Sequence, residues 1–243
     1  EGMGWEHFGF IHIIYLTAFT LATLVLAIVY RKSKNQRRRR IRCFYAWTIV
    51  MLEVVKQFLC LFTGVYEPGL IPLHLCGMGI FIILVHTYHS NRWTSDLLYA
   101  LVMPGAIAAL LFSDWTSYPL ANFYCQQSFF IHFFEFSYPV LLLAGGDLRP
   151  RLRELWHSAV YCLIVVPPVF VFNKVFGTNF FFINGAAPGS PLSFLANLLG
   201  DPGYLVGFAV MVILVWLVMY LPWTIADAIS KRRELRLTTS TET

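Results

Sequence analysis

The sequence contains few charged residues, and this scarcity excludes most soluble folds. Only 13% of its 243 residues are charged, about half the share of a soluble domain, whereas 58% are hydrophobic and the mean hydropathy is +0.64. The five cysteines are widely spaced without a CxxC pair, which argues against a disulfide framework or a structural zinc site. A basic groove with interleaved aromatic residues is also missing, so nucleic acid is not expected as a partner. We therefore expect an integral membrane protein.

Several catalytic and cofactor motifs are missing as well. The chain has no GxSxG elbow, no HExxH zinc motif, no P-loop and no dinucleotide fingerprint. The last apolar stretch holds no lysine, which excludes a retinal Schiff base there. His86 and His89 share a helix face, but no third ligand follows at a fixed spacing. We predict neither a metal nor a cofactor, and a metal-dependent hydrolase built on these two histidines is a remote alternative.

Long apolar runs are what the sequence has in abundance. Seven of them approach the roughly 20 residues that cross a bilayer as a helix. They predict an all-α, polytopic membrane helix bundle that forms a single integral domain over residues 1–243. Prolines inside several runs predict kinks, which are tolerated where neighbouring helices satisfy the freed carbonyls. The predicted spans are Phe8–Tyr30, Cys43–Val65, Pro72–His89, Asp96–Phe112, Asn122–Leu143, His157–Phe176 and Gly203–Trp223.

The distribution of Lys and Arg predicts how the bundle is oriented. The first connector, residues 31–42, is strongly basic, as are the fifth connector and the tail, residues 231–243, whereas the second and fourth connectors lack bases. Because basic connectors stay in the cytoplasm, we expect the N-terminus outside and the C-terminal tail inside. Anionic lipid is the expected partner of the basic loop 31–42. The protein is expected to be a multi-pass component of a bacterial plasma membrane or a eukaryotic endomembrane.

The sixth connector, residues 177–202, is unusually apolar. It is too hydrophobic for an ordinary solvated loop, and Gly and Pro interrupt it too often for a helix. We predict a re-entrant segment or lid at the outer mouth of the bundle. The side-chain amides of Asn179 and Asn197 would be available there to bind a substrate head group or an oxyanion, although loop amides as often form turns.

A histidine and a cysteine stand at the start of the third predicted span, in Ile71-Pro-Leu-His-Leu-Cys76. Pro72 suits the first turn of a helix, so Cys76 is expected about one turn below the outer interface. His132 of the fifth predicted span lies about ten residues, roughly 15 Å, from the same interface. A histidine can take the proton of a buried thiol and so generate a thiolate. We predict that Cys76 is a nucleophile and His132 its base.

Two further residues belong to this predicted site. His74 precedes Cys76 by two residues, about 200° around a helix, so the two are not expected to share a face. We interpret His74 as a hydrogen-bonding partner of a neighbouring helix or a substrate head group; the alternative is a core histidine whose hydrogen bonds are satisfied within the protein. Glu135 follows His132 by three residues and is expected either to orient its ring or to pack on Gln126 or Gln127.

Glu53 and Lys56 stand midway through the second predicted span. A buried structural ion pair is the favoured interpretation, because opposite charges at this spacing lower each other's desolvation cost. The other interpretation is that they meet the polar site. A non-enzymatic seven-helix transporter or sensor, with a polar pathway lined by these two residues and the histidines, is therefore an alternative.

Three of these stretches together resemble a known family. The Pro-Leu-His-Leu-Cys motif ending at Cys76, the aromatic stretch Phe129–Phe134 and the segment Asn179-Phe-Phe-Phe are similar to YwaF-type integral membrane proteins, a group related to eukaryotic transmembrane protein 164. The eukaryotic member is understood as a cysteine–histidine acyltransferase. The resemblance implies that Cys76 and His132 move a fatty acyl chain between a phospholipid and a lysophospholipid through a thioester. A lipid hydrolase is the second alternative.

Overall fold

The computed structural model describes residues 4–241, and the side chains of residues 4–231. All regular structure in this part of the chain is helical, which confirms the predicted all-α bundle. Seven helical stretches of the described residues are long and apolar enough to cross a membrane, so the protein is a multi-pass integral membrane protein. They are Phe10–Lys32 (α1), Asn35–Thr63 (α2), Pro68–Tyr88 (η1 Pro68–Leu70 and α3 Leu75–Tyr88), Arg92–Leu111 (α4 Arg92–Leu97, η2 Leu98–Val102 and α5 Met103–Leu111), Phe123–Gly145 (α6), Leu152–Phe176 (η3 Leu152–Glu154 and α7 Trp156–Phe176) and Tyr204–Lys231 of α9 (Tyr204–Thr241).

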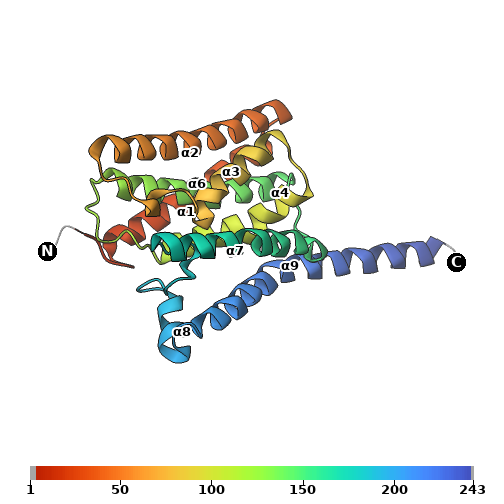
Figure 1. The fold of residues 1–243 in the computed structure, drawn as a ribbon. Helices are drawn as coiled ribbons and strands as arrows, with labels where there is room; N and C mark the ends of the chain where they lie inside the picture. The colour runs from red at the N-terminus through yellow and green to blue at the C-terminus, as the bar shows by residue number, and fades with distance from the viewer. Residues whose placement is uncertain (1–3, 242–243) are drawn as a thin grey trace.

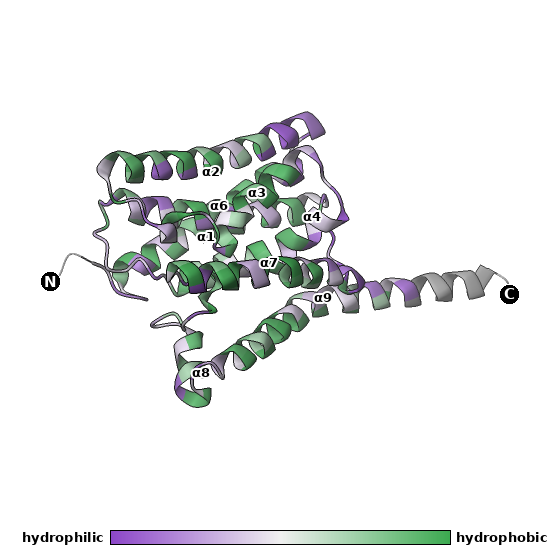
Figure 2. Ribbon diagram, viewed as in Figure 1, coloured by the Kyte–Doolittle hydropathy of each residue, from purple (hydrophilic) through white to green (hydrophobic). Residues whose placement is uncertain are grey.

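Helix α6 is the centre of the arrangement. Helices α1, α2, α3 and α5 all pack on it, whereas α1 and α2 make few contacts with each other. Figure 1 shows α1 to α7 as a bundle of roughly aligned rods, with α8 and the first half of α9 set to one side. Figure 2 shows hydrophilic residues gathered at the α1–α2 junction and on α9 beyond its apolar part, at the same end of the bundle. We call this the basic end. The opposite end, where α3 begins and where the cavity lined by Cys76 lies, is called the cavity end.

The predicted basic loop 31–42 is almost entirely helical. Helix α1 continues to Lys32 and α2 begins at Asn35, so the loop prediction was wrong. Arginine is a good helix former, and charge alone does not interrupt a helix. The last helix is likewise longer than predicted, because α9 continues through the predicted tail as far as Thr241.

Pro104 confirms that a neighbouring helix satisfies a carbonyl freed by proline. A proline has no N–H to donate to the carbonyl four residues earlier, which here belongs to Ala100. The helix widens into the π-turn η2 just before Pro104, and the Ala100 oxygen accepts a hydrogen bond from the indole nitrogen of Trp216 at 2.7 Å. One missing backbone bond therefore helps to attach α9 to the bundle.

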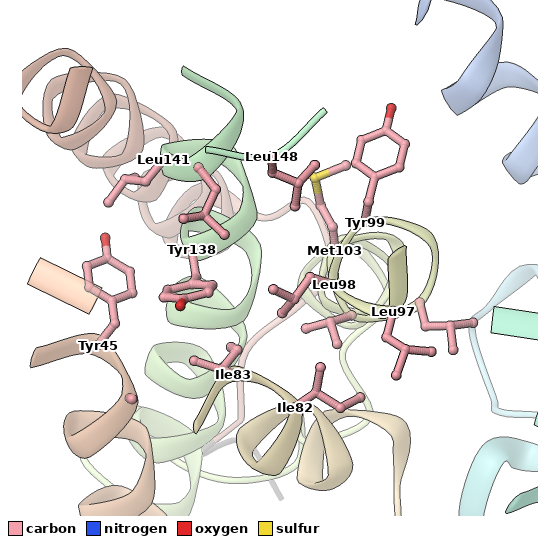
Figure 3. Close-up of a cluster of buried hydrophobic side chains, with 14 of the residues drawn as sticks. Tyr45, Ile82, Ile83, Leu97, Leu98, Tyr99, Met103, Tyr138, Leu141 and Leu148 are labelled. Carbon is pink, nitrogen blue, oxygen red and sulfur yellow. The ribbon is translucent and has the colours of Figure 1, made fainter. Parts of the chain in front are cut away.

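The larger apolar core joins α2, α3, α4, η2 and α6 (Figure 3). In lipid, helices associate chiefly through close van der Waals packing rather than through exclusion of water. The packing in Figure 3 fixes α3 against α6, the two helices that carry Cys76 and His132. The side chains of this core include Tyr45, Ile82, Ile83, Leu97, Leu98, Tyr99, Met103, Tyr138, Leu141 and Leu148.

The connector 177–202 divides into two different parts. The first part contains the short helix η4 (Phe180–Phe182) and is tied to α7 by Asn173, whose side chain bonds both the N–H and the carbonyl of Phe180 at 2.9 Å. The second part contains helix α8 (Pro191–Leu199), which packs on α9. The prediction of a non-helical connector was therefore wrong for α8. Ser190 caps this helix and Pro191 occupies its first turn, a combination that favours a helix start.

Candidate active site

A cavity of about 360 Å³ lies at the cavity end of the bundle. Cys76 of α3 and His132 of α6 both line it, together with His74 and the pair Glu53 and Lys56 of α2. The η1 segment and the loop between α5 and α6 complete its wall. Helices α2, α3 and α6 thus bring charged groups, a thiol and an imidazole to one space.

The backbone before α3 turns sharply to place the thiol. The helix begins at Leu75, so Pro72 lies in the preceding bend and the prediction that it opens the helix was wrong. Gly77 permits this bend, because a Cβ at this position would lie 2.5 Å from the backbone carbonyl of Pro72. The close approach folds the chain back over the first turn of α3 and places Cys76 at the second residue of the helix, beside the cavity.

The N-terminus of α3 is suited to negative charge. Its cap residue, His74, provides no side-chain hydrogen bond, and the first helical bond runs from the N–H of Met78 to the carbonyl of His74 at 2.9 Å. The three preceding amides, of residues 75–77, are the donors that a helix leaves without intrahelical partners. Together with the helix dipole they favour a thiolate or an oxyanion at this position.

His132 is held in the form that a base requires. Its Nδ1 lies 2.7 Å from the carbonyl oxygen of Ser128. Because a carbonyl only accepts, Nδ1 carries the proton, and Nε2 of the neutral ring keeps a free lone pair. Trp115 stacks on the ring, with centroids 5.0 Å apart and planes 10° apart, and fixes its orientation. A buried aromatic cluster that includes Phe129 and Phe133 supports Trp115.

His74 lies at the cavity despite its spacing from Cys76. The expectation that the two residues lie on different faces was wrong, because His74 is the cap of α3 and has an extended backbone (φ −63°, ψ 158°) rather than a helical one. Its ring packs edge-on against Phe180 and lies 5.2 Å from the ring of Phe182. The η4 segment therefore packs against His74, whereas its action as a lid stays a prediction.

Glu135 does not orient the ring of His132. That role belongs to the Ser128 carbonyl, whereas both carboxylate oxygens of Glu135 lack a hydrogen-bond partner among the described residues. The side chain is completely buried and packs on α3, where a Cβ at Gly79 would lie 2.5 Å from Oε1. Packing on a neighbouring glutamine was also wrong: the Gln126 amide bonds Tyr15 and the Gln127 amide donates to Glu53.

Asn179 and Asn197 do not line the cavity. The Asn179 side chain instead shapes the connector around η4, accepting from the N–H of Asn184 at 3.0 Å and donating to the carbonyl of Gly185 at 2.8 Å. This is the turn-forming role that the sequence left open. Asn197 is exposed on α8, the helix that packs on α9.

Glu53 and Lys56 form the expected ion pair, with 2.8 Å between Nζ and Oε1. They also line the cavity, so both interpretations of these residues hold at once. Gln57 and Gln127 also donate to the two oxygens of Glu53 at 2.6 and 3.4 Å, so one ammonium group and two amides hold the carboxylate.

His86 is occupied in a different network at the basic end. Its Nδ1 bonds the hydroxyl of Tyr138 at 2.9 Å and its Nε2 bonds Ser90 at 3.2 Å. The exposed residue His89 ends α3. Over the residues that the structure describes, no group of three potential ligands gathers as a metal site.

Sequence reasoning missed three residues of the site. Ser128 stands four residues before His132, the spacing at which a helical side chain can reach a carbonyl, and this was the available signal. Trp115 and Asp114 come from the α5–α6 loop, and nothing in the sequence links them to His132. Burial raises the pKa of Asp114, so this carboxyl takes up a proton at a higher pH than an exposed aspartate would.

Comparison with known proteins agrees with the class that the fold defines, a multi-pass membrane protein with a polar cavity between its helices. The family model of the TMEM164 family matches residues 3–220, and the chain belongs to this family. Searches of curated proteins and of solved structures found no match.

Proposed function

We propose that the protein is a membrane-embedded acyltransferase that moves a fatty acyl chain between phospholipids through a thioester on Cys76. The observation that carries this proposal is the shared cavity, into which α3 brings a thiol at a helix N-terminus and α6 brings a histidine with a free Nε2. A nucleophile beside an oriented base is the arrangement that covalent acyl transfer requires.

The first half of the proposed reaction loads the enzyme. Nε2 of His132 takes the thiol proton, and the Cys76 sulfur attacks the ester carbonyl of a phospholipid. The carbon–oxygen bond to the glycerol breaks, the departing alkoxide receives the proton from His132, and a lysophospholipid leaves. The acyl chain is then bound to Cys76 as a thioester.

The second half transfers the chain to an acceptor. The hydroxyl group of another lysophospholipid gives its proton to Nε2 of His132 and attacks the thioester carbonyl. The carbon–sulfur bond breaks, and the Cys76 thiolate recovers the proton from His132. If water takes the place of the acceptor, the same steps release a free fatty acid, which is the hydrolase alternative.

Backbone amides at the start of α3 are the proposed oxyanion donors. The tetrahedral intermediates carry negative charge on the former carbonyl oxygen, next to the attacked carbon. The amides of Cys76 and Gly77 stand in the uncapped first turn beside the nucleophile, where they need no rearrangement to donate. We prefer them to Asn197, which lies on α8 away from the cavity lining.

Two polar side chains of the cavity are the proposed contacts of a phospholipid head group. Lys56 is the lysine that lines the cavity, and we propose that its ammonium group, which already pairs with Glu53, also contacts the phosphate. His74, under the η4 lid, provides a second group for the head group. Glu135, buried against Gly79 of α3, has no assigned contact with the substrate.

Labelling with a lipid-like, thiol-reactive electrophile tests the nucleophile. We expect purified protein to be modified at Cys76, because this is the cysteine that lines the same cavity as His132. The other four cysteines are internal controls, and mapping the modified peptide by mass spectrometry identifies the site. Competition by phospholipid should protect Cys76.

Two results would contradict the proposal. Preferential modification of Cys43 or Cys162, which are also half-buried, would show that reactivity follows general accessibility instead of the cavity. A transporter or sensor would be favoured by two results together. Phospholipid would not slow the labelling of Cys76, and alkylation of Cys76 would leave the function of the protein undiminished.

A further inference from the structure

A second cavity lies at the basic end, between α1 and α2. It has a volume of about 780 Å³. Because α1 and α2 both pack on α6 but hardly on each other, the space between them is a slot with α6 as its floor. Apolar side chains line its inner part, and they come from all three helices. These residues are Leu26, Ile41, Phe44, Tyr45 and Phe134.

Cationic side chains line the rim of this slot. They are Lys32, Lys34, Arg37 and Arg40, and none of them forms a salt bridge with a residue whose side chain the structure describes. The neighbouring arginines differ, because Arg38 and Arg42 pair with Asp147 at 3.0 and 3.4 Å. The rim cations are therefore left for a ligand from outside the protein.

The backbone adds to the positive field at the rim. Helix α2 is 29 residues long, begins at Asn35 and has neither a side-chain cap nor an acidic residue in its first turn. Its dipole and its first amides therefore favour an anion. The negative end of α1, which lies next to it, is neutralised by Arg38, whose guanidinium donates to the carbonyls of Tyr30 and Ser33 at 3.2 and 3.1 Å.

We propose that this slot binds one anionic phospholipid from the leaflet at the basic end. Its head group would meet the cations of the rim and the N-terminus of α2, and one acyl chain would lie along the apolar floor. The charge complementarity selects an anion, and the apolar slot selects a lipid over a soluble phosphate. This site is separate from the Cys76 cavity and does not depend on the proposed acyl transfer.

Lipid binding to delipidated full-length protein in a neutral detergent tests the proposal. Native mass spectrometry would compare phosphatidylglycerol with phosphatidylcholine of the same chains. We expect the wild-type protein to prefer phosphatidylglycerol, and R37Q/R40Q to weaken its binding about 25-fold, since each basic residue at the surface contributes about fivefold. The matched control is R31Q/R39Q, which removes the same charge from the same segment outside the slot.

The control separates a built site from general attraction. Unchanged phosphatidylglycerol binding in R31Q/R39Q, with unchanged phosphatidylcholine binding in both variants, supports the proposal and shows that both proteins are folded. An equal loss in the two double variants would mean that net charge alone attracts the lipid, and would overturn it. Displacement of phosphatidylglycerol by excess inorganic phosphate would overturn a lipid as the occupant.

Discussion

Replacing Cys76 with serine is expected to reduce acyl transfer by on the order of 10³-fold or more. An alcohol is a far weaker acid than a thiol, so the helix N-terminus and His132 would not produce an adequate nucleophile. The substitution exchanges a single atom in a half-buried side chain, and we expect the bundle to remain intact. The measurement is the amount of labelled acyl chain that purified protein moves from phospholipid to lysophospholipid.

Cys162→Ser is the matched control for this variant. Cys162 is also half-buried, but it lies on α7 and does not line the cavity, so transfer should proceed at the wild-type rate. Thermal unfolding in detergent should give the same midpoint for both variants. Wild-type transfer by Cys76→Ser would remove the covalent mechanism.

Replacing His132 with asparagine is expected to slow transfer by about 10²- to 10⁴-fold, the usual contribution of a general base. An asparagine amide can still donate to the Ser128 carbonyl, as Nδ1 does, but it has no counterpart of Nε2. The variant therefore removes the base and retains the local hydrogen bond. Initial rates of transfer measure the effect.

The pH dependence distinguishes loss of a base from loss of structure. Without His132, the thiolate must form by direct ionisation, so the rate of His132→Asn should rise with pH towards the wild-type rate. A damaged cavity would give a low rate at every pH. His89→Asn is the control, because His89 is exposed at the basic end and should not affect transfer. A rate for His132→Asn equal to that of the wild type would exclude His132 as the base.

The sequence was sufficient for the bundle because long apolar runs have a single solution in lipid, a helix with all of its backbone bonds satisfied. It also placed Cys76 and His132 at a similar depth, and the structure gives both to one cavity. It did not give the start of α3, because the bend depends on the close approach of Gly77 to the backbone of Pro72. This contact is tertiary in nature and leaves no periodic signal.

Because tertiary contacts leave no periodic signal in the sequence, the surroundings of His132 and His74 were also predicted wrongly. Helical spacing predicted Glu135 on the same side of α6 as His132, but spacing does not reveal that a carbonyl one turn earlier holds the ring. For His74 the assumption of a helical backbone was the error, since a cap residue does not follow helical periodicity. Trp115 reaches His132 from a loop, and loop geometry is not encoded in any local pattern.

The most direct test of the central claim is to detect the acyl chain on the protein. Purified protein would be incubated with a phospholipid that carries an isotopically labelled acyl chain, quenched in acid and digested, and the peptide containing Cys76 would be weighed. We predict the added mass of one acyl group on Cys76, lost on treatment with neutral hydroxylamine and absent after addition of lysophospholipid acceptor. Acyl transfer to the acceptor without any labile acyl group on Cys76 would contradict the account.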